Sequence, residues 1–202
     1  MQEHVIKTYS FGELSEEAQQ TALEKFYDIN VDFEEWSECI IDDAKELGSL
    51  MGIEIRNIFY SGFYSQGDGA CFEGSYAYQK GGLKAIKEYA PQDQELHRIA
   101  RGLQAIQRPN FYQLSATVKQ SGHYMHSHCT DINVLKETDY DSWHPDWDIT
   151  DGISELLRDF MDWIYRQLDK EYEFQTGKEQ IKDTILANDY QFNKDGTFNT
   201  CY

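Results

Sequence analysis

The sequence predicts an α+β fold, in which an antiparallel sheet of about four strands is packed by several helices. Three observations support this. Helix-type spacing of apolar residues dominates both ends of the 202-residue chain, and strand-type patterns fill its middle. The two kinds of segment do not alternate regularly, as they would in a parallel βαβ sheet. A chain of this length can bury a sizeable core, so we expect residues 1–202 to form a single acidic domain.

Two helices are expected ahead of the sheet. Ser15 can cap the first, which should run to about Asp28, because the two acids after Ser15 then lie at the positive end of the helix dipole. The second should begin near Asp32 and end near Gly48 or Gly52, since its apolar residues recur at intervals of three and four positions. The acids of that segment fall outside the apolar stripe.

The middle of the chain changes to strand-type patterns. Residues 53–60 and 70–78 are rich in β-branched and aromatic side chains, which predicts two neighbouring antiparallel strands. Two short helices should follow, around residues 82–89 and 92–106, with Pro91 between them.

A second hairpin is predicted from residues 111–120 and 123–135, joined at Ser121-Gly122. It completes the sheet of about four strands. A loop then leads into a long helix with an apolar stripe, and a last helix is expected near residues 178–188.

The chain is strongly acidic. Its 36 Asp and Glu residues against 18 Lys and Arg give a formal net charge of −18. Such a field repels nucleic acids and anionic membranes and attracts basic surfaces, so we expect a basic protein partner and no direct contact with nucleic acid or membrane. The alternative is that these acids form solvated helix faces that keep the protein soluble. Residues 80–108 are mildly basic and interrupt the acidic pattern.

The cysteine and hydropathy patterns predict a cytoplasmic protein. Four widely spaced cysteines include no C-x-x-C pair, and no signal peptide is recognisable, so a reducing compartment is expected. No stretch reaches the length of about 18 apolar residues that a membrane helix needs. These patterns do not predict an oligomeric state.

The segment SGFYSQGDGACFEGSY, residues 61–76, combines glycines, aromatics, an acid and a thiol. It lacks the Lys of a phosphate-binding P-loop, and β-type residues follow its glycines where a helix should begin. A hairpin shaped by glycines is therefore the first interpretation, and a loop that also binds a partner through Ser65, Gln66 and Asp68 is the second. A small-ligand or nucleotide site beside residues 64–69 is a further alternative.

A cluster of three imidazoles and a thiol supplies ligand types that zinc prefers: His123, His126, His128 and Cys129. On a regular strand, His126 and His128 share one face and the other two share the opposite face, so fourfold coordination would need a bulge or outside ligands. The alternative is a half-exposed strand whose histidines pack against tyrosines. A metal-binding protein or metal-dependent enzyme is thus the alternative function, with zinc as its cofactor.

Acids and tryptophans near the long helix form a second candidate surface. Trp143 and Trp147 could anchor an interface that acids steer. Three acids spaced three and four residues apart could present charge to a surface evolved for phosphates: Glu155, Asp159 and Asp162. Arg158 and Arg166 intervene on the same helix, which argues against pure nucleic-acid mimicry. No catalytic motif is present, so we do not expect an enzyme.

Three short motifs carry a family resemblance: SGFxSQGDGACFEG at residues 61–74, DAKE at 43–46 and FMxWIY at 160–165. With them, the chain resembles a family of uncharacterised proteins from phages and bacterial mobile elements. Some members carry the label "antitoxin of toxin–antitoxin stability system". The resemblance covers roughly residues 14–190 and implies a phage- or plasmid-associated cytoplasmic protein, without catalytic residues to assign. Together with the charge, it predicts a non-enzymatic inhibitor of a basic, nucleic-acid-handling partner such as a toxin or phage-defence factor.

Overall fold

The computed structural model describes residues 7–136 and 147–199. Within them it confirms the α+β class, with six α-helices, a four-stranded antiparallel sheet and a two-stranded sheet. The elements, in chain order, are β1 (Tyr9–Ser10), the 3₁₀-helix η1 (Phe11–Glu13), α1 (Glu16–Lys25), α2 (Glu35–Met51), β2 (Ile53–Ser61), β3 (Gly69–Ala77), α3 (Gly82–Tyr89), α4 (Gln94–Gln107), the 3₁₀-helix η2 (Arg108–Asn110), β4 (Leu114–Gln120), β5 (Thr130–Lys136), α5 (Trp147–Gln175), α6 (Lys178–Ala187) and β6 (Gln191–Phe192).

The chain divides into two compact units, and each is described by itself. The terminal unit comprises Met1–Glu38 and Lys170–Tyr202, and the central unit comprises Cys39–Asp169. The expectation of a single domain stays a prediction.

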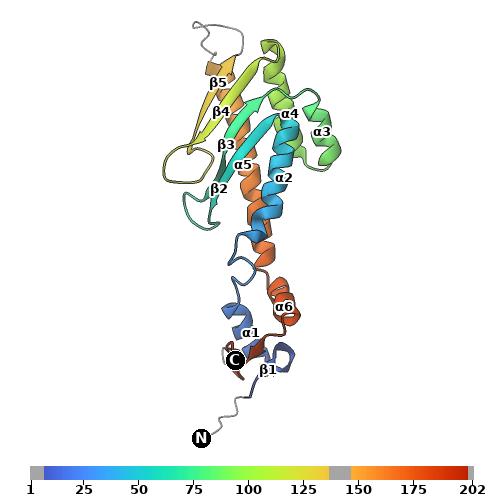
Figure 1. The fold of residues 1–202 in the computed structure, drawn as a ribbon, viewed down its shortest axis with the longest axis vertical. Coiled ribbons are helices and arrows are strands. Elements are labelled where there is room, and N and C mark those ends of the chain that lie inside the picture. The colour runs from blue at the N-terminus through green and yellow to red at the C-terminus, as the bar shows by residue number, and fades with distance from the viewer. Residues whose placement is uncertain (1–6, 137–146, 200–202) are drawn as a thin grey trace. The chain divides into compact units, whose positions relative to one another are not determined.

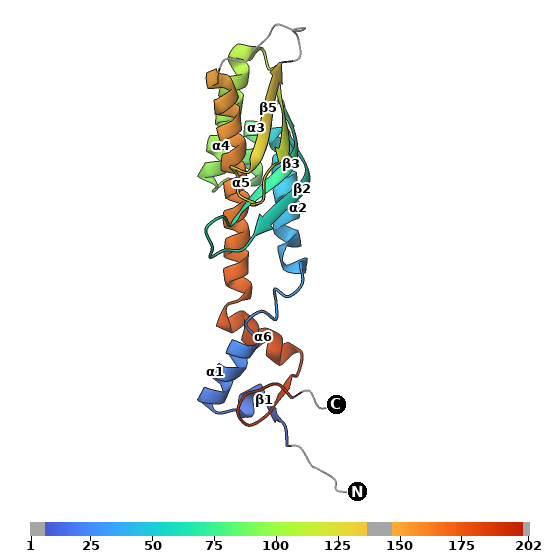
Figure 2. The same ribbon diagram turned by 90° about the vertical axis from the view of Figure 1, so that its left-hand side faces the viewer.

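The central unit is built on the sheet β2-β3-β4-β5, in which every neighbouring pair is antiparallel. Figure 1 shows the four strands side by side, and Figure 2 shows α3, α4 and α5 on one side of them. The contacts agree with this arrangement. The ring of Phe72 on β3 meets Phe160 of α5 edge to face, with centroids 6.2 Å apart. Gln107 of α4 donates from Nε2 to the hydroxyl of Tyr76 on β3 at 3.2 Å.

The predicted helices of the first quarter are confirmed, with shifted ends. Ser15 caps α1 by accepting a hydrogen bond from the amide of Ala18 at 3.3 Å. The helix ends at Lys25 rather than near residue 28, because backbone hydrogen bonds of a turn follow, such as that from the amide of Ile29 to the carbonyl of Phe26 at 3.0 Å.

The prediction for the second hairpin is wrong at its turn. β4 ends at Gln120 and β5 begins at Thr130, so residues 121–129 form a loop rather than a two-residue turn followed by a strand. The amide of Ser121 donates to the carbonyl of Cys129 at 2.8 Å and closes the base of the loop. Gly122 then takes a left-handed backbone with φ of 90°, which turns the chain out of the ladder.

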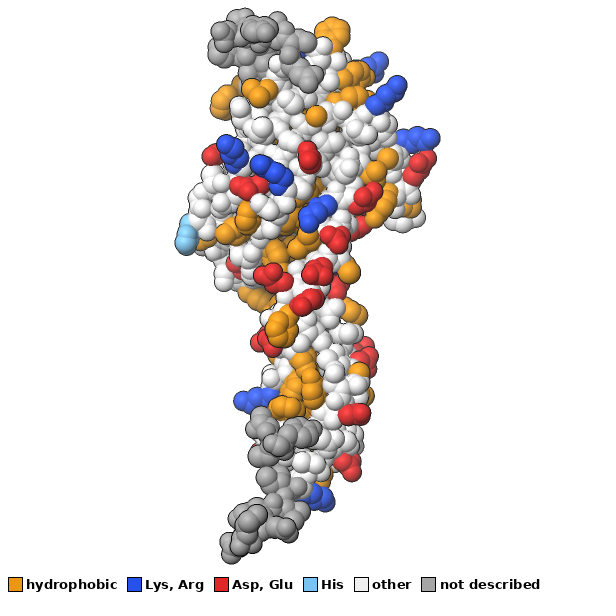
Figure 3. Space-filling view, viewed as in Figure 1, with side chains coloured by type: hydrophobic (Ala, Val, Ile, Leu, Met, Phe, Trp, Pro, Cys, Tyr) orange, Lys and Arg blue, Asp and Glu red, His pale blue; other side chains and the backbone are white. Residues whose placement is uncertain are grey.

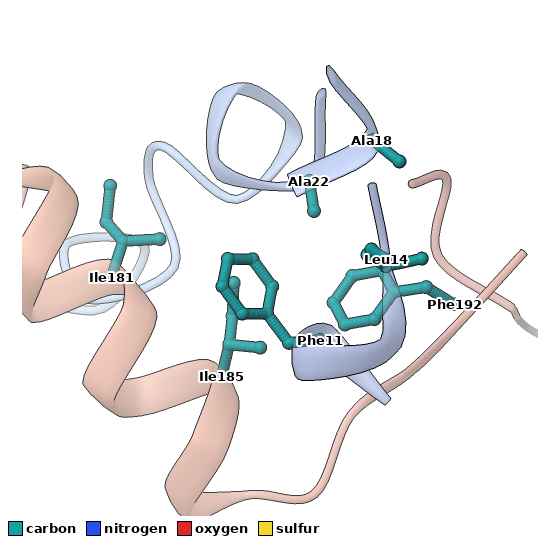
Figure 4. Close-up of a cluster of buried hydrophobic side chains, with 7 residues drawn as sticks. All are labelled: Phe11, Leu14, Ala18, Ala22, Ile181, Ile185 and Phe192. Carbon is teal, nitrogen blue, oxygen red and sulfur yellow. The ribbon is translucent and has the colours of Figure 1, made fainter. Parts of the chain in front are cut away.

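The terminal unit has an apolar core of its own, in which residues from the two ends of the chain pack together (Figure 4). Its buried members are Phe11, Leu14, Ala18, Ala22, Ile181, Ile185 and Phe192. The short strands β1 and β6 pair beside this core, with Tyr9 opposite Phe192.

Within residues 7–136 and 147–199, no helix combines the length and the apolar character that crossing a membrane requires.

Candidate functional site: two loops at one end of the sheet

Two loops of the central unit contact each other at one end of the sheet. The β2–β3 loop comprises residues 62–68, and the β4–β5 loop comprises residues 121–129. Because β3 and β4 are antiparallel neighbours, both hairpins turn at the same end. A Cβ added to Gly67 would lie 2.9 Å from the Tyr124 ring, and one added to Gly69 would lie 2.6 Å from His126 Cα. The β4–β5 loop therefore packs against Gly67 of the β2–β3 loop and Gly69 of β3, two positions without a side chain.

Asp68 shapes the β2–β3 loop from within. Its Oδ2 accepts hydrogen bonds from the amides of Tyr64 at 3.0 Å and Ser65 at 2.6 Å. Gly62 lies against the same carboxylate, since a Cβ there would be 2.5 Å from Oδ2. The acid of the 61–76 motif is thus occupied by its own loop.

The β2–β3 loop is anchored on α5 through Tyr165. The Tyr165 hydroxyl donates to the carbonyl of Gly62 at 3.1 Å, and its ring stacks on Phe63 with centroids 5.5 Å apart. Burial, followed by the negative charges of Asp68 and Asp169, raises the pKa of the Tyr165 hydroxyl, which keeps it a hydrogen-bond donor. This contact leaves the tip of the loop facing outward.

The tip of the β2–β3 loop faces solvent. Ser65 and Gln66 are exposed, and Tyr64 is 77% exposed. Asp68 is half-buried and turned toward the amides that it holds. A partner contact through these predicted residues stays a prediction, and Ser65 and Gln66 are the two that the loop presents directly.

The β4–β5 loop brings a thiol and an imidazole together. Cys129 Sγ lies 3.5 Å from His126 Nε2, within hydrogen-bond distance for sulfur. The rings of Tyr124 and His126 are nearly parallel, with an interplanar angle of 13° and centroids 6.2 Å apart. His128 approaches His126 edge to face at 6.2 Å. These contacts orient the His126 ring.

The strand geometry expected for the histidine cluster is wrong, because residues 123–129 lie in a loop. Among the described residues, no group of three or more His, Cys, Asp or Glu side chains could hold a metal ion. A zinc site stays a prediction that elemental analysis of untagged protein, purified without chelator, would test.

Cys71 lies on β3 and is fully buried. Burial, with smaller contributions from the charges of Cys129 and Glu73, raises the pKa of its thiol to about 11. Cys71 is therefore a protonated, inert thiol at neutral pH.

The predicted acids of α5 differ in their surroundings. Asp159 is paired with Arg98 of α4, with Nη1 and Oδ2 2.9 Å apart. Glu155 and Asp162 are exposed, and neither forms an ion pair within the described parts of the chain. Arg166, one turn further on, pairs with Glu95 at 2.6 Å.

The two predicted tryptophan anchors are only partly placed. Trp147 begins α5 and is 78% exposed. Trp143 lies outside the described residues. Trp163 is buried and donates from Nε1 to Asp93 Oδ2 at 2.7 Å, so it belongs to the α4–α5 packing.

A stripe of acids on α2 was not singled out as a site by the sequence. Four exposed acids fall within about 80° of arc on this helix, given 100° of rotation per residue: Glu35, Glu38, Asp42 and Glu46. None of them forms an ion pair with another described residue. The sequence shows these acids as the polar side of an amphipathic helix. It does not show that acids elsewhere, such as Asp159, form ion pairs while these four do not.

A model of one protein family, described as a domain of unknown function, DUF8835, matches residues 36–178. This span is more than half of the chain and contains β2 to β5, both sheet-end loops, all of α5 and nearly all of α2. The chain belongs to the DUF8835 family. Searches of curated proteins and of solved structures found no match. The two contacting loops thus lie in the part of the chain that the DUF8835 family defines.

Proposed function

We propose that the chain is a non-enzymatic acidic binding protein that inhibits a basic, nucleic-acid-handling partner. The partner class is a toxin or a phage-defence factor, and the action is antitoxin-like or anti-defence, with acids standing in for phosphates. The resemblance to phage and mobile-element proteins supports the setting, the cytoplasm of a bacterial host. The net charge of −18 supports a partner with a positively charged surface.

The observation that carries the proposal is the unpaired acidic stripe of α2. The opposite side of α2 is buried and includes Ala44, Leu47 and Met51. Packing of that side keeps the acidic stripe on the exposed side of the helix. Figure 3 shows acidic side chains along α2 on this face, with basic side chains nearby. The exposed Lys45 lies on the same helix. Exposed carboxylates without internal partners stay available to a basic surface, and they lose little on binding because no ion pair must break.

Other charged surfaces of the central unit fit a basic partner less well. On α5, Arg166 adds positive charge among the acids, and Arg98 of α4 pairs with Asp159. On the α3–α4 pair, Lys84, Lys87 and Arg101 are exposed and would repel such a partner. The α2 stripe is therefore the proposed contact.

The test is capture of the partner from host lysate on the immobilised full-length chain, followed by identification and by binding of the purified partner at several salt concentrations. A partner with a positive surface should bind tightly at low salt and be released as salt rises, because the Debye length falls from roughly 30 Å at 0.01 M to about 8 Å at 0.15 M. The partner's own activity on nucleic acid should be inhibited by the chain.

Charge-reversal variants locate the contact. Asp42→Lys with Glu46→Lys should weaken binding at least about tenfold, because two attractive pairs become repulsive. Glu155→Lys with Asp162→Lys changes the net charge by the same amount on α5 and should weaken it much less. Capture that is insensitive to salt, or equal effects of the two variants, would count against the α2 contact, and failure to retain any basic protein at low salt would count against the function itself.

A further inference from the structure

The β4–β5 loop holds a nucleophile and a base at contact distance. Cys129 Sγ and His126 Nε2 are 3.5 Å apart, the geometry in which an imidazole takes the hydrogen of a thiol. The thiolate formed in this way is the reactive form of cysteine. We propose that Cys129 is a reactive-thiol site that His126 activates, and that peroxides are its substrate class.

The base is oriented by a third group, as in activated nucleophiles generally. Tyr124 lies nearly parallel to the His126 ring, at an interplanar angle of 13°. Both residues depend on the β2–β3 loop, since Tyr124 packs on Gly67 and the backbone of His126 packs on Gly69. Any side chain at those two glycines would displace the pair.

The backbone of the loop fixes the distance between the two groups. The amide of Cys129 donates to the carbonyl of His126 at 2.9 Å, and the carbonyl of Cys129 accepts from Ser121 at 2.8 Å. The Thr130 hydroxyl donates to the carbonyl of Ser127 at 2.7 Å and ties down the turn between them. The pair is therefore held by its loop before any ligand arrives.

An exposed glycine lies beside the sulfur. Cys129 is half-buried, and Gly122 lies beside it, so that an added Cβ would be 3.7 Å from Sγ. Gly122 carries no side chain that could cover the thiol, and its backbone φ of 90° favours glycine there. The expected route of a small electrophile to Sγ is therefore past the backbone of Gly122.

The proposed step balances with hydrogen peroxide as the oxidant. The Sγ proton passes to His126 Nε2, and the thiolate attacks one peroxide oxygen while the O–O bond breaks. The departing hydroxide takes the proton from His126 and leaves as water. The sulfur is oxidised by two electrons to a sulfenic acid, and the peroxide is reduced by the same two.

The chain contains its own reference thiols. Cys39 is exposed on α2 and forms no hydrogen bond with another described residue. Cys71 is buried, and its raised pKa of about 11 keeps it protonated. Rates at the three positions can be compared in one sample by peptide mass spectrometry.

The experiment measures iodoacetamide alkylation and dimedone capture after peroxide treatment at neutral pH. A free thiol is only a few per cent thiolate at this pH, so activation should make the alkylation rate of Cys129 about tenfold or more higher than that of Cys39. Dimedone should label Cys129 first. A Cys129 rate equal to or below that of Cys39 in the unaltered protein overturns the proposal, whatever the variants do.

Two histidine variants separate activation from mere exposure. His126→Gln removes the base and should lower the Cys129 rate to that of Cys39 or below. His123→Gln alters an exposed imidazole of the same loop, for which the described residues show no ring contact or hydrogen bond with His126 or Cys129, and should leave the rate unchanged. Equal rates in wild type and His126→Gln would also overturn the proposal. Because the site rests on the loop and not on the α2 acids, its failure would leave the proposed binding function untouched.

Discussion

Gly69 accepts no side chain, although its backbone conformation would suit other residues. A Cβ there would lie 2.6 Å from both Cα and Cβ of His126, closer than real contacts allow. Gly67 differs, because its φ of 101° is left-handed and its absent side chain also makes room for Tyr124. At the scale of single residues, the glycines of the 61–76 motif therefore serve a neighbouring loop as well as their own turn.

Gly69→Ala should lower the free energy of unfolding by about 1–3 kcal/mol, because the backbone of His126 must move to admit the methyl group. Urea unfolding measures the loss, and amide exchange should show faster opening of residues 121–129. Gly12→Ala is the matched control, since a Cβ at Gly12 meets nothing within 4 Å, and it should change stability by less than about 0.5 kcal/mol. Equal losses in the two variants would contradict the steric argument.

The buried hydroxyl of Tyr76 should make the free energy of unfolding depend on pH in the alkaline range. Burial raises the pKa of its hydroxyl from 10.0 to about 12, against the smaller lowering effect of the hydrogen bond with Gln107. A phenol with a raised pKa in the folded state contributes stability that is full below pH 10 and is lost as pH rises toward 12. The wild type should therefore lose about 1 kcal/mol more than Tyr76→Phe between about pH 9 and 11, as measured by urea unfolding. Parallel losses in the two proteins would contradict this assignment.

At the scale of elements, Asp93 joins the start of α4 to the middle of α5. Its Oδ1 accepts hydrogen bonds from the amides of Glu95 and Leu96, at 3.1 and 3.0 Å, which caps the helix. Its Oδ2 accepts from Trp163 Nε1 at 2.7 Å. One carboxylate thus satisfies a helix terminus and a buried indole.

Asp93→Ala should lower the free energy of unfolding by about 2–3 kcal/mol, about 1 from the lost cap and the rest from the unpaired indole. Ser15→Ala, which removes only the cap of α1, should cost about 1 kcal/mol. A double-mutant cycle with Trp163→Phe in urea should show that the two sites are coupled. A coupling energy near zero would mean that the indole contact adds nothing to stability.

At the scale of the whole molecule, the two compact units have separate apolar cores. The terminal unit packs residues from both ends of the chain around Phe11 and Phe192, whose ring centroids are 6.2 Å apart. The match to the DUF8835 family begins at residue 36 and ends at residue 178, so all the buried residues of this core lie outside it.

Phe192→Ala removes a fully buried ring and should destabilise the terminal unit by about 3–5 kcal/mol. Hydrogen exchange followed by mass spectrometry should show lost protection in α1 and α6 and unchanged protection in β2 to β5. Loss of protection spread evenly over both units would instead mean that residues 1–202 unfold as the single cooperative domain expected from chain length.

The sequence by itself determined the fold class, the order of the six α-helices and of the four strands of the larger sheet, and the cap at Ser15, but not the short strands β1 and β6. These follow from apolar periodicity and from contacts between residues close in the chain, which local patterns record. The predicted end of α1 moved by a few residues, because turn hydrogen bonds compete with the helix at its end. The start of β5 moved further, from residue 123 to Thr130, because a loop replaces the predicted tight turn.

The tertiary structure alone decided the surroundings of the candidate residues. The β3–β4 register, with Gly74 opposite Val118, sets the β2–β3 loop beside the β4–β5 loop, and no local signal encodes that pairing. Packing of α4 on α5 pairs Asp159 with Arg98, whereas Asp42 and Glu46 of α2 form no ion pair with another described residue. The free energy of these contacts depends on groups that are far apart in sequence, so composition and spacing could identify the charges and the thiol but not their partners.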